Sequence, residues 1–269
     1  MLRRVSCLML LLIFWLQALA AAAAAPPKIS AQAAVLINAK TGQVLFGKNE
    51  HNIMYPASTT KMMTLITALE KGDLNSKVTV SSRAAACDGS SLELRAGDQL
   101  SLRQLLTGMM LVSGNDAAEA TAENVAGSVW KFVGMMNNNA LKMRLENTHF
   151  SNPHGLPDRT HYSTALDLAR IAAYGLKNPT FAKIVSTPEY SFSFYNRPGV
   201  RHIVNTNKLL KTFSGANGVK TGSTQAAGDC LVAAAKRNDI ELIAVVLNDD
   251  ERWDDAPNLL EYGFKRMAE

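Results

Sequence analysis

The chain has 269 residues, of which 47% are hydrophobic and 19% are charged, and its formal net charge is +5. This length and apolar content suffice for one large domain with a sizeable core, and they exclude a disordered chain and a small disulfide scaffold. The mild basic excess fits an anionic partner, but no Arg and Lys cluster interleaved with aromatic residues is present, which argues against nucleic-acid binding.

The first 25 residues have the layout of a secretory signal peptide. Arg3 and Arg4 precede an apolar run over residues 8–16, and an alanine run follows up to Ala25. The apolar run is short for a membrane span. We therefore expect a cleaved signal peptide over residues 1–25 and a mature domain over residues 26–269, exported across the bacterial cytoplasmic membrane to the periplasm, the cell wall or the medium. Only an uncleaved segment would give membrane contact.

Cysteine and histidine residues indicate no metal site in the sequence. Cleavage of the signal segment removes Cys7 and leaves Cys87 and Cys230, whose pairing the sequence leaves open. No Cys and His set has the spacing of a zinc site. Each of the five histidines is therefore expected to be a surface or hydrogen-bonded structural residue, namely His51, His149, His154, His161 and His202.

Two strands are predicted near the start of the mature domain, at residues 34–37 and 44–46. A Lys-Thr-Gly tripeptide at residues 40–42 lies between them, and Gly42 supplies the positive φ that a tight hairpin needs. We therefore interpret this tripeptide as a turn.

Ser58 and Lys61 stand at the start of an apolar helix that Lys71 and Gly72 end. Hydrophobic residues recur at helical spacing, so the helix is expected to be buried on most sides. Residues i and i+3 share a helix face, so the Ser58 hydroxyl and the Lys61 amine can come within hydrogen-bonding reach. Burial lowers the pKa of an ammonium, and a neutral amine can take the proton of a nucleophilic serine. Ser58 also lies near a helix N-terminus, where backbone amides favour negative charge.

The middle of the chain is predicted to be helical. Residues 78–102, interrupted by glycines and serines, predict only short strands and loops. Four helices are expected after them, at residues 102–112, 116–125, 129–145 and 164–175. Ser113 and Asn115 lie on the turn between the first two, where both side chains can point into one cleft, although each is also a common helix cap. A second Ser-x-x-Lys, at Ser128 and Lys131, is interpreted as a helix cap.

The last third of the chain predicts strands again. These strands cover residues 190–194, 231–235 and 242–247, with a turn at 237–239 and a closing helix at 257–264. A second Lys-Thr-Gly lies in a strand region just before this hairpin: Gly222 leaves room for a substrate beside the backbone, Thr221 offers a hydroxyl, and Lys220 places a cation in the cleft. Strands at both ends around a helical middle predict an α/β sandwich whose sheet is assembled from both termini of the domain.

The motifs that begin at Ser58, Ser113 and Lys220 occur in the order and relative spacing of penicillin-binding proteins and serine β-lactamases. More closely, residues 30–265 resemble the low-molecular-mass D-alanyl-D-alanine carboxypeptidases, peptidase family S11. The resemblance is carried by residues 55–64, 151–156, 220–224, 227–231 and 260–264. It implies the β-lactamase/transpeptidase-like fold, an antiparallel sheet with a helical subdomain, in which the three motifs converge on one groove.

The resemblance also implies a mechanism without a metal or organic cofactor. Ser58 would attack the carbonyl between the last two D-alanines of a peptidoglycan stem peptide, with Lys61 as base, and water would then release the acyl-enzyme. The backbone amides of Ser58 and Ser223 would bind the oxyanion. Ser113 would relay the proton to the leaving amine.

The remaining motif residues would bind the substrate. Asn115 would hold the peptide backbone, while Lys220 and Thr221, with Gly222 beside them, would position the terminal carboxylate. β-Lactams are expected to inhibit by acylating the same serine. Ser223 stands where relatives often have histidine, although any residue except proline supplies the backbone amide.

Several alternatives share these motifs. A class A β-lactamase needs a Glu-x-x-x-Asn loop, and none occurs between Asn115 and Lys220. A D,D-endopeptidase and a non-enzymatic β-lactam sensor or wall-binding module remain open. Because the sequence reaches Glu269 just after the catalytic domain, we expect no C-terminal β domain or amphipathic anchor.

Overall fold

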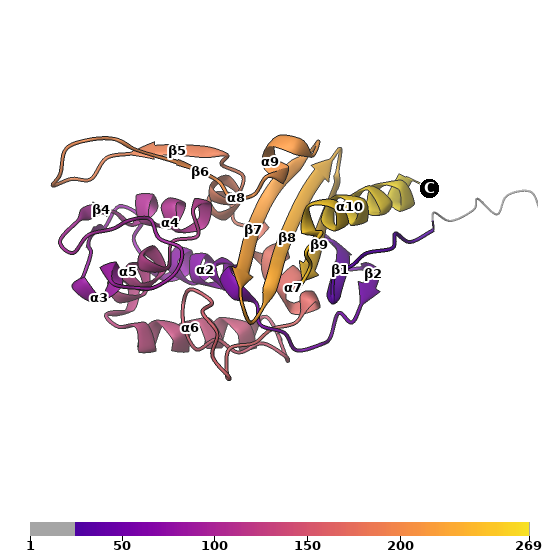
Figure 1. Ribbon diagram of the computed structural model, residues 1–269, viewed down its shortest axis with the longest axis horizontal. Helices are drawn as coiled ribbons and strands as arrows, with labels where there is room; N and C mark the ends of the chain where they lie inside the picture. The colour runs from indigo at the N-terminus through magenta and orange to yellow at the C-terminus, as the bar shows by residue number, and fades with distance from the viewer. Residues whose placement is uncertain (1–24, 269) are drawn as a thin grey trace, which may run out of the picture.

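The computed structural model describes residues 25–268, and its centre is a five-stranded antiparallel sheet in the order β2-β1-β9-β8-β7. Its strands are β1 Ala33–Asn38, β2 Val44–Lys48, β7 Ala216–Thr224, β8 Gly228–Arg237 and β9 Ile240–Leu247. β1 pairs with β9, so that Val35 lies opposite Val245, and the two ends of the domain share one sheet. The predicted α/β architecture and both predicted hairpins are therefore confirmed (Figure 1).

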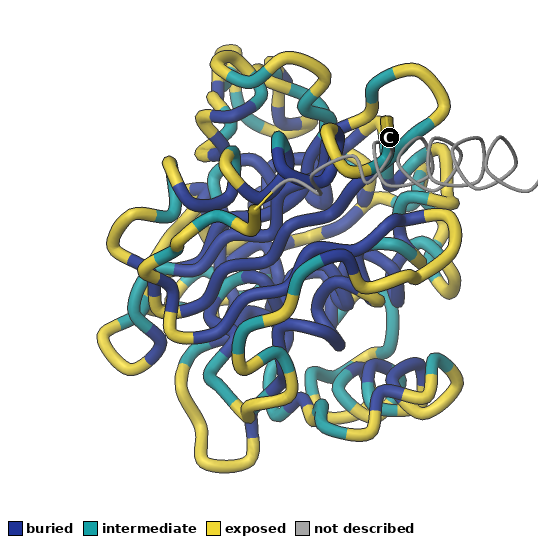
Figure 2. Tube along the Cα trace, turned by 90° about the vertical axis from the view of Figure 1, so that its right-hand side faces the viewer, coloured by how far each residue is buried: buried dark blue, intermediate teal, exposed yellow. Residues whose placement is uncertain are grey.

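Both faces of the sheet are covered, which explains the nearly continuous apolar runs of its central strands. Leu36 on one face belongs to a cluster with residues of α10, Arg252–Ala268. Val35 on the other face belongs to the main core, which α7, Ala165–Leu176, helps to form. Figure 2 shows the strands side by side and buried along their centres.

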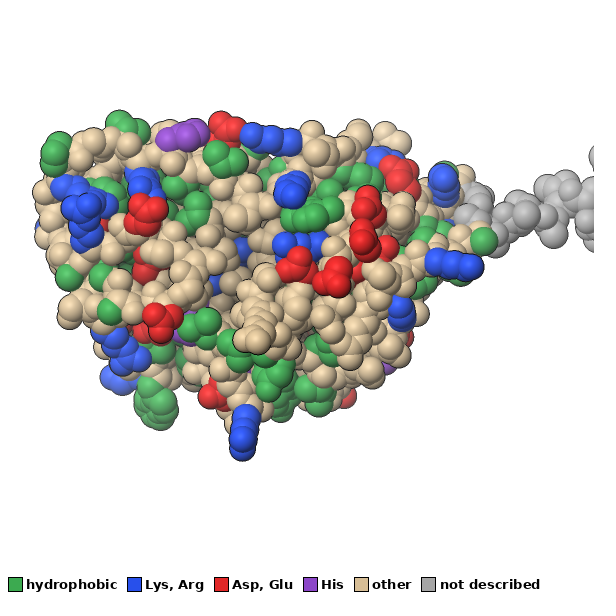
Figure 3. All heavy atoms as spheres, in the orientation of Figure 1, with side chains coloured by type: hydrophobic (Ala, Val, Ile, Leu, Met, Phe, Trp, Pro, Cys, Tyr) green, Lys and Arg blue, Asp and Glu red, His purple; other side chains and the backbone are tan. Residues whose placement is uncertain are grey.

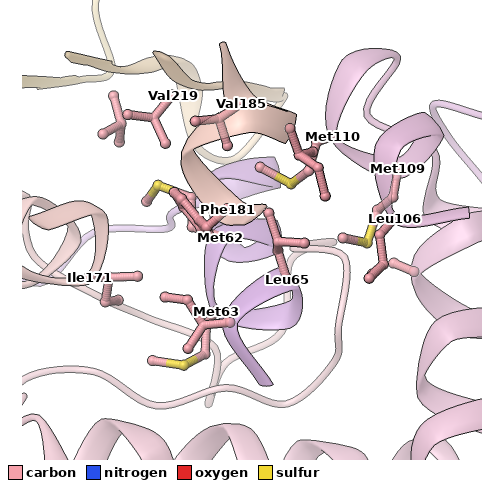
Figure 4. Close-up of a cluster of buried hydrophobic side chains, with 14 of the residues drawn as sticks. Met62, Met63, Leu65, Leu106, Met109, Met110, Ile171, Phe181, Val185 and Val219 are labelled. Atoms are coloured by element: carbon pink, nitrogen blue, oxygen red, sulfur yellow. The ribbon is translucent and has the colours of Figure 1, made fainter. Parts of the chain in front are cut away.

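Beside the sheet lies a helical part of the molecule, in which the helices surround α2, Lys61–Lys71. α2 packs against α7 and against four further helices, α4 Leu102–Leu111, α5 Asn115–Ala126, α6 Val129–Lys142 and α8 Pro179–Val185. In Figure 4, Met62 and Leu65 of α2 lie among side chains of α4 and α8, with Val219 of β7 at the side of the sheet. Every residue of α2 from Lys61 to Ala68 is buried, as its apolar pattern predicted.

Short elements complete the fold. They are η1 Ala57–Thr60, β3 Lys77–Thr79, α3 Ser82–Ala85, β4 Gln99–Ser101, β5 Glu189–Phe192, β6 Arg201–Val204 and α9 Leu209–Thr212. β5 and β6 form a separate hairpin, and the sequence predicted only its first strand. The prediction for residues 78–102, short elements and loops, is confirmed.

Three predicted helix boundaries or turns can be compared with the structure. The helix predicted to reach residue 145 ends at Lys142, because Arg144 adopts a left-handed φ of 56°. α10 begins at Arg252, five residues before the predicted start at Pro257. The Lys-Thr-Gly copy at residues 40–42 forms the β1–β2 turn as predicted, with Gly42 at φ 74°.

Ser128 caps α6 by accepting a hydrogen bond from the Lys131 amide at 3.3 Å, which confirms the structural interpretation of the second Ser-x-x-Lys. Cys87 and Cys230 are both free thiols. Over residues 25–268, no helix combines the length and the apolar character needed to cross a membrane. Apart from Ala25, the predicted signal segment lies outside the described residues.

Candidate active site

Ser58 and Lys61 meet at the junction of η1 and α2. Lys61 Nζ lies 2.9 Å from Ser58 Oγ, 2.7 Å from Asn115 Oδ1 and 2.8 Å from the carbonyl oxygen of His154. The Lys61 side chain is fully buried, and this burial holds the pKa of its amine well below the usual value of 10.5, with Lys220 adding to the effect. The i, i+3 prediction therefore holds in geometry.

The three partners of Lys61 Nζ indicate which of them its N–H bonds and its lone pair would face. A neutral amine has two N–H bonds and one lone pair. Two of its three neighbours, the Asn115 side-chain oxygen and the His154 carbonyl, can only accept hydrogen bonds. The lone pair is then left for the third neighbour, the Ser58 hydroxyl. With the amine neutral, the Ser58 hydroxyl would donate to Lys61 Nζ, an orientation in which the lysine could accept the serine proton.

A turn over residues 152–156 supplies two carbonyl groups to α2. The His154 carbonyl accepts from Lys61, and the Pro153 carbonyl accepts from Thr64 Oγ1 at 2.5 Å. Gly155, at φ 96°, has its Cα against the carbonyl of Ala57, so that a methyl group there would overlap that carbonyl. In the sequence, residues 151–156 helped to carry the family resemblance, and their contact with the catalytic candidates was not predicted.

The second motif lies on the turn between α4 and α5. Ser113 is buried there at a left-handed φ of 65°, and Asn115 is the first residue of α5. The Asn115 side chain bridges two segments, because its oxygen accepts from Lys61 and its Nδ2 donates to the Asp88 carbonyl at 2.6 Å. The structure therefore joins the first and second motifs through one hydrogen bond, a contact that sequence spacing did not predict.

The third motif runs along β7, the edge strand beside η1. A methyl group at Gly222 would lie 3.1 Å from the Ser58 amide nitrogen and 3.1 Å from Ala57 Cβ, so glycine allows the strand to approach the nucleophile. Thr221 Oγ1 lies 2.7 Å from Thr206 Oγ1. Ser223 is exposed on the same strand, directly after Gly222.

Lys220 is as buried as Lys61. Its Nζ donates to the Thr221 carbonyl at 2.9 Å, and burial together with the charge of Arg252 lowers the pKa of Lys220 to about 7. Arg252 in turn donates to the Gly222 carbonyl at 2.7 Å. Sequence reasoning missed Arg252, because it lies 30 residues after Gly222, in the first turn of α10.

The three motifs therefore converge between the helical part and the sheet. Figure 3 shows Lys or Arg side chains recessed in the surface between these two parts. Two of the five histidines, His154 and His161, are buried, and the other three are exposed. His161 Nε2 lies 2.8 Å from Thr60 Oγ1, and burial lowers the pKa of His161 to about 3.

Comparison with known sequences gives a consistent set of relatives. The family model described as D-alanyl-D-alanine carboxypeptidase matches residues 20–251. D-alanyl-D-alanine carboxypeptidase DacF of Bacillus subtilis is 39% identical over 244 residues, which are 88% of this chain and 62% of DacF. The D-alanyl-D-alanine carboxypeptidase of Streptomyces sp. strain K15 is 38% identical, covering 88% of each chain. The chain thus spans less than two thirds of the length of DacF.

Solved structures agree with the sequences. The Streptomyces K15 DD-transpeptidase superposes with a TM-score of 0.86 at 36% identity, covering 90% of this chain and 100% of that one. D-alanyl-D-alanine carboxypeptidase from Mycobacterium tuberculosis H37Rv also has a TM-score of 0.86, at 34% identity, covering 91% of this chain and 95% of the other. The β-lactamase-like fold is therefore shared along most of the described chain.

Proposed function

This chain belongs to the D-alanyl-D-alanine carboxypeptidase family of serine peptidases, and on that premise we propose that it removes the terminal D-alanine of peptidoglycan stem pentapeptides through an acyl-enzyme on Ser58. One observation carries the proposal: Lys61 Nζ lies 2.9 Å from Ser58 Oγ while two fixed oxygen atoms take its other hydrogen-bonding positions. A fully buried lysine does not stabilise an apolar core. In this setting it suits the role of a base that activates a nucleophile.

In the acylation step, Ser58 Oγ attacks the carbonyl carbon of the penultimate D-alanine and its proton passes to Lys61 Nζ. The backbone N–H groups of Ser58 and Ser223 bind the oxyanion, which the close approach of Gly222 to Ser58 supports. Collapse of the tetrahedral intermediate breaks the C–N bond, and Ser113 relays the proton from Lys61 Nζ to the leaving amine. Water then attacks the ester and restores the Ser58 hydroxyl.

The free edge of β7 suits an extended peptide. An edge strand can pair with a substrate backbone through main-chain hydrogen bonds, and β7 has β8 as its only strand partner in the sheet of the described chain. Lys220 and Thr221 would bind the terminal carboxylate. Because Lys220 is buried and its pKa is about 7, its charge at neutral pH depends on an anion arriving beside it.

The proposed substrate indicates the cellular compartment of the protein. Peptidoglycan stem peptides lie outside the cytoplasmic membrane, and the signal-like segment over residues 1–25 supports export to that compartment. β-Lactams are proposed inhibitors, because their strained amide resembles the D-Ala-D-Ala bond and their leaving group stays attached to the acyl-enzyme.

Mass spectrometry tests the site and the reaction together. Incubation with penicillin should add one molecule per chain on Ser58, and incubation with a pentapeptide ending in D-Ala-D-Ala should release D-alanine repeatedly. Ser58→Ala should abolish both, whereas Ser128→Ala, which removes only the cap of α6, should keep both. A label on Ser128 would refute the site.

Turnover separates the remaining alternatives. Acylation that is never followed by release would identify a sensor, and rapid release of hydrolysed penicillin would identify a β-lactamase. Cleavage of cross-linked peptide dimers in preference to pentapeptides would identify an endopeptidase.

A further inference from the structure

Cys87, Glu119 and His154 converge although they lie far apart in the sequence. Cys87 follows α3, Glu119 lies within α5, and His154 lies on the turn over residues 152–156. One ligand atom from each residue, the thiol sulfur, a carboxylate oxygen and a ring nitrogen, lies within 4.8 Å of the other two. Thiolate, carboxylate and imidazole are the side-chain groups that bind zinc in proteins.

Glu119 provides a second, independent indication. The residue is only 6% exposed, and its Oε2 has no hydrogen-bond partner within residues 25–268. Oε1 lies 3.3 Å from His154 Nε2, and Arg83 Nε approaches Oε2 only to 3.5 Å. A buried carboxylate oxygen that accepts no hydrogen bond and has only this long contact to Arg83 costs free energy, and a cation bound directly to it would remove that cost.

We propose that Cys87, Glu119 and His154 form a binding site for a zinc ion, with water as the fourth ligand. Zinc bonds of about 2.0 Å to nitrogen and oxygen and about 2.3 Å to sulfur place tetrahedral ligand atoms about 3.3 to 3.5 Å apart. The present separations of up to 4.8 Å must therefore shrink modestly. Cys87 is half-buried on a loop, so its side chain can make this movement.

Zinc binding moves protons in a defined way. The Leu156 amide donates to His154 Nδ1 at 3.2 Å, so Nε2 now carries the ring proton and faces Glu119. Coordination by Nε2 transfers that proton to Nδ1 and gives up the Leu156 hydrogen bond, which spans only two residues. The Cys87 thiol loses its proton to solvent as the sulfur–zinc bond forms. The balance is one proton released per zinc bound.

The zinc site adjoins the catalytic candidates through the backbone. The carbonyl of His154 accepts from Lys61, and the carbonyl of Asp88, next to Cys87, accepts from Asn115. Ligation therefore draws both carbonyl-bearing loops toward α5. Displacing catalytic groups by about 1 Å can cost a factor of about 100 in rate, so bound zinc should slow acylation of Ser58. This effect on rate rests on the proposed function, whereas the zinc site does not.

Cobalt(II) in place of zinc provides the direct test, using the full mature chain without an affinity tag. The wild type should show a thiolate-to-cobalt charge-transfer band and the intense visible bands of four-coordinate cobalt, and zinc should displace the cobalt. Cys87→Ser should lose the charge-transfer band and weaken zinc binding by at least roughly tenfold in calorimetry. Cys230→Ser, a change at the other free thiol, is the matched control and should keep both.

Arg83→Gln adds a variant with the opposite expectation. It removes the exposed cation that competes with zinc for Glu119 Oε2, and should tighten zinc binding. Absence of the charge-transfer band from the wild type, or its survival in Cys87→Ser, would overturn the site.

Penicillin acylation, measured with and without zinc in the wild type and in Cys87→Ser, tests the link to Ser58. Slowing in the wild type alone supports the link, and an equal rate with zinc bound refutes it. Failure to acylate under any condition would refute the proposed function, and the cobalt spectrum would still decide the zinc site.

Discussion

Replacement of Gly155 by alanine should disable acylation without touching a catalytic side chain. A methyl group there would overlap the carbonyl of Ala57, the residue before Ser58, and Gly155 also has a left-handed φ of 96°. The left-handed conformation costs alanine about 1 to 2 kcal/mol. Because the overlap must be relieved by movement of roughly 1 Å, the hydrogen bonds from Lys61 and Thr64 to this turn weaken, at about 1 kcal/mol each.

The total loss in the free energy of unfolding is therefore about 3 to 4 kcal/mol, and the displaced Ser58 should acylate about 100-fold more slowly. Gly127→Ala is the matched control, because Gly127 has φ 75° but nothing within 4 Å of an added methyl group. Gly127→Ala should cost only about 1 to 2 kcal/mol, a fall of roughly 2 to 8 °C in Tm, with normal acylation.

Stopped-flow acylation by a fluorescent penicillin, combined with thermal unfolding of both variants, provides the measurement. If Gly155→Ala acylates at the rate of Gly127→Ala, the turn over residues 152–156 does not position Ser58 and Lys61, and the reasoning above fails.

Three further predictions concern the lysines. Lys61→Arg should abolish acylation in the same stopped-flow assay, because a guanidinium stays protonated and cannot act as a base, and near-normal acylation would remove Lys61 from that role. Lys220→Ala should lose at least roughly tenfold in kcat/KM on a pentapeptide with a free terminal carboxylate, because a charge-assisted contact contributes about 1.5 to 3 kcal/mol, whereas Lys40→Ala, in the β1–β2 turn, should change little. On the amidated peptide Lys220→Ala should have no additional effect, and full additivity would contradict a contact between Lys220 and the carboxylate. The pKa of Lys220 is lowered to about 7, so its charge is lost as pH rises through that value. The ratio of kcat/KM for the free acid to kcat/KM for the amide should therefore fall between about pH 7 and 9. A constant ratio would contradict the prediction.

Local patterns in the sequence were enough to determine several elements and the candidate nucleophile. The apolar run that contains Lys61 predicted a helix buried on most sides, and on a helix the spacing of Ser58 and Lys61 places them on one face. The two hairpins were predictable because turn residues separate strands of matching apolar character. These features depend on neighbours within a few residues, which the linear sequence displays directly.

Other features depended on how distant segments meet. The hydrogen bond from Lys61 to Asn115 joins residues 54 positions apart in the sequence, and the hydrogen bond from Lys61 to the His154 carbonyl joins residues 93 positions apart. α10 begins before Pro257, and its first residue, Arg252, donates a hydrogen bond to the Gly222 carbonyl on β7, 30 residues earlier in the chain. Spacing along the chain contains no information on such contacts.

The grouping of Cys87, Glu119 and His154 shows the same limit most clearly. Metal-site motifs are recognisable in a sequence when their ligands share one short loop or helix face, and these three residues come from three segments. The sequence therefore identified candidate residues for acyl transfer. Only the packing of the helices and turns against one another decided which other groups surround them, because that packing sets the distances between side chains that the chain itself keeps far apart.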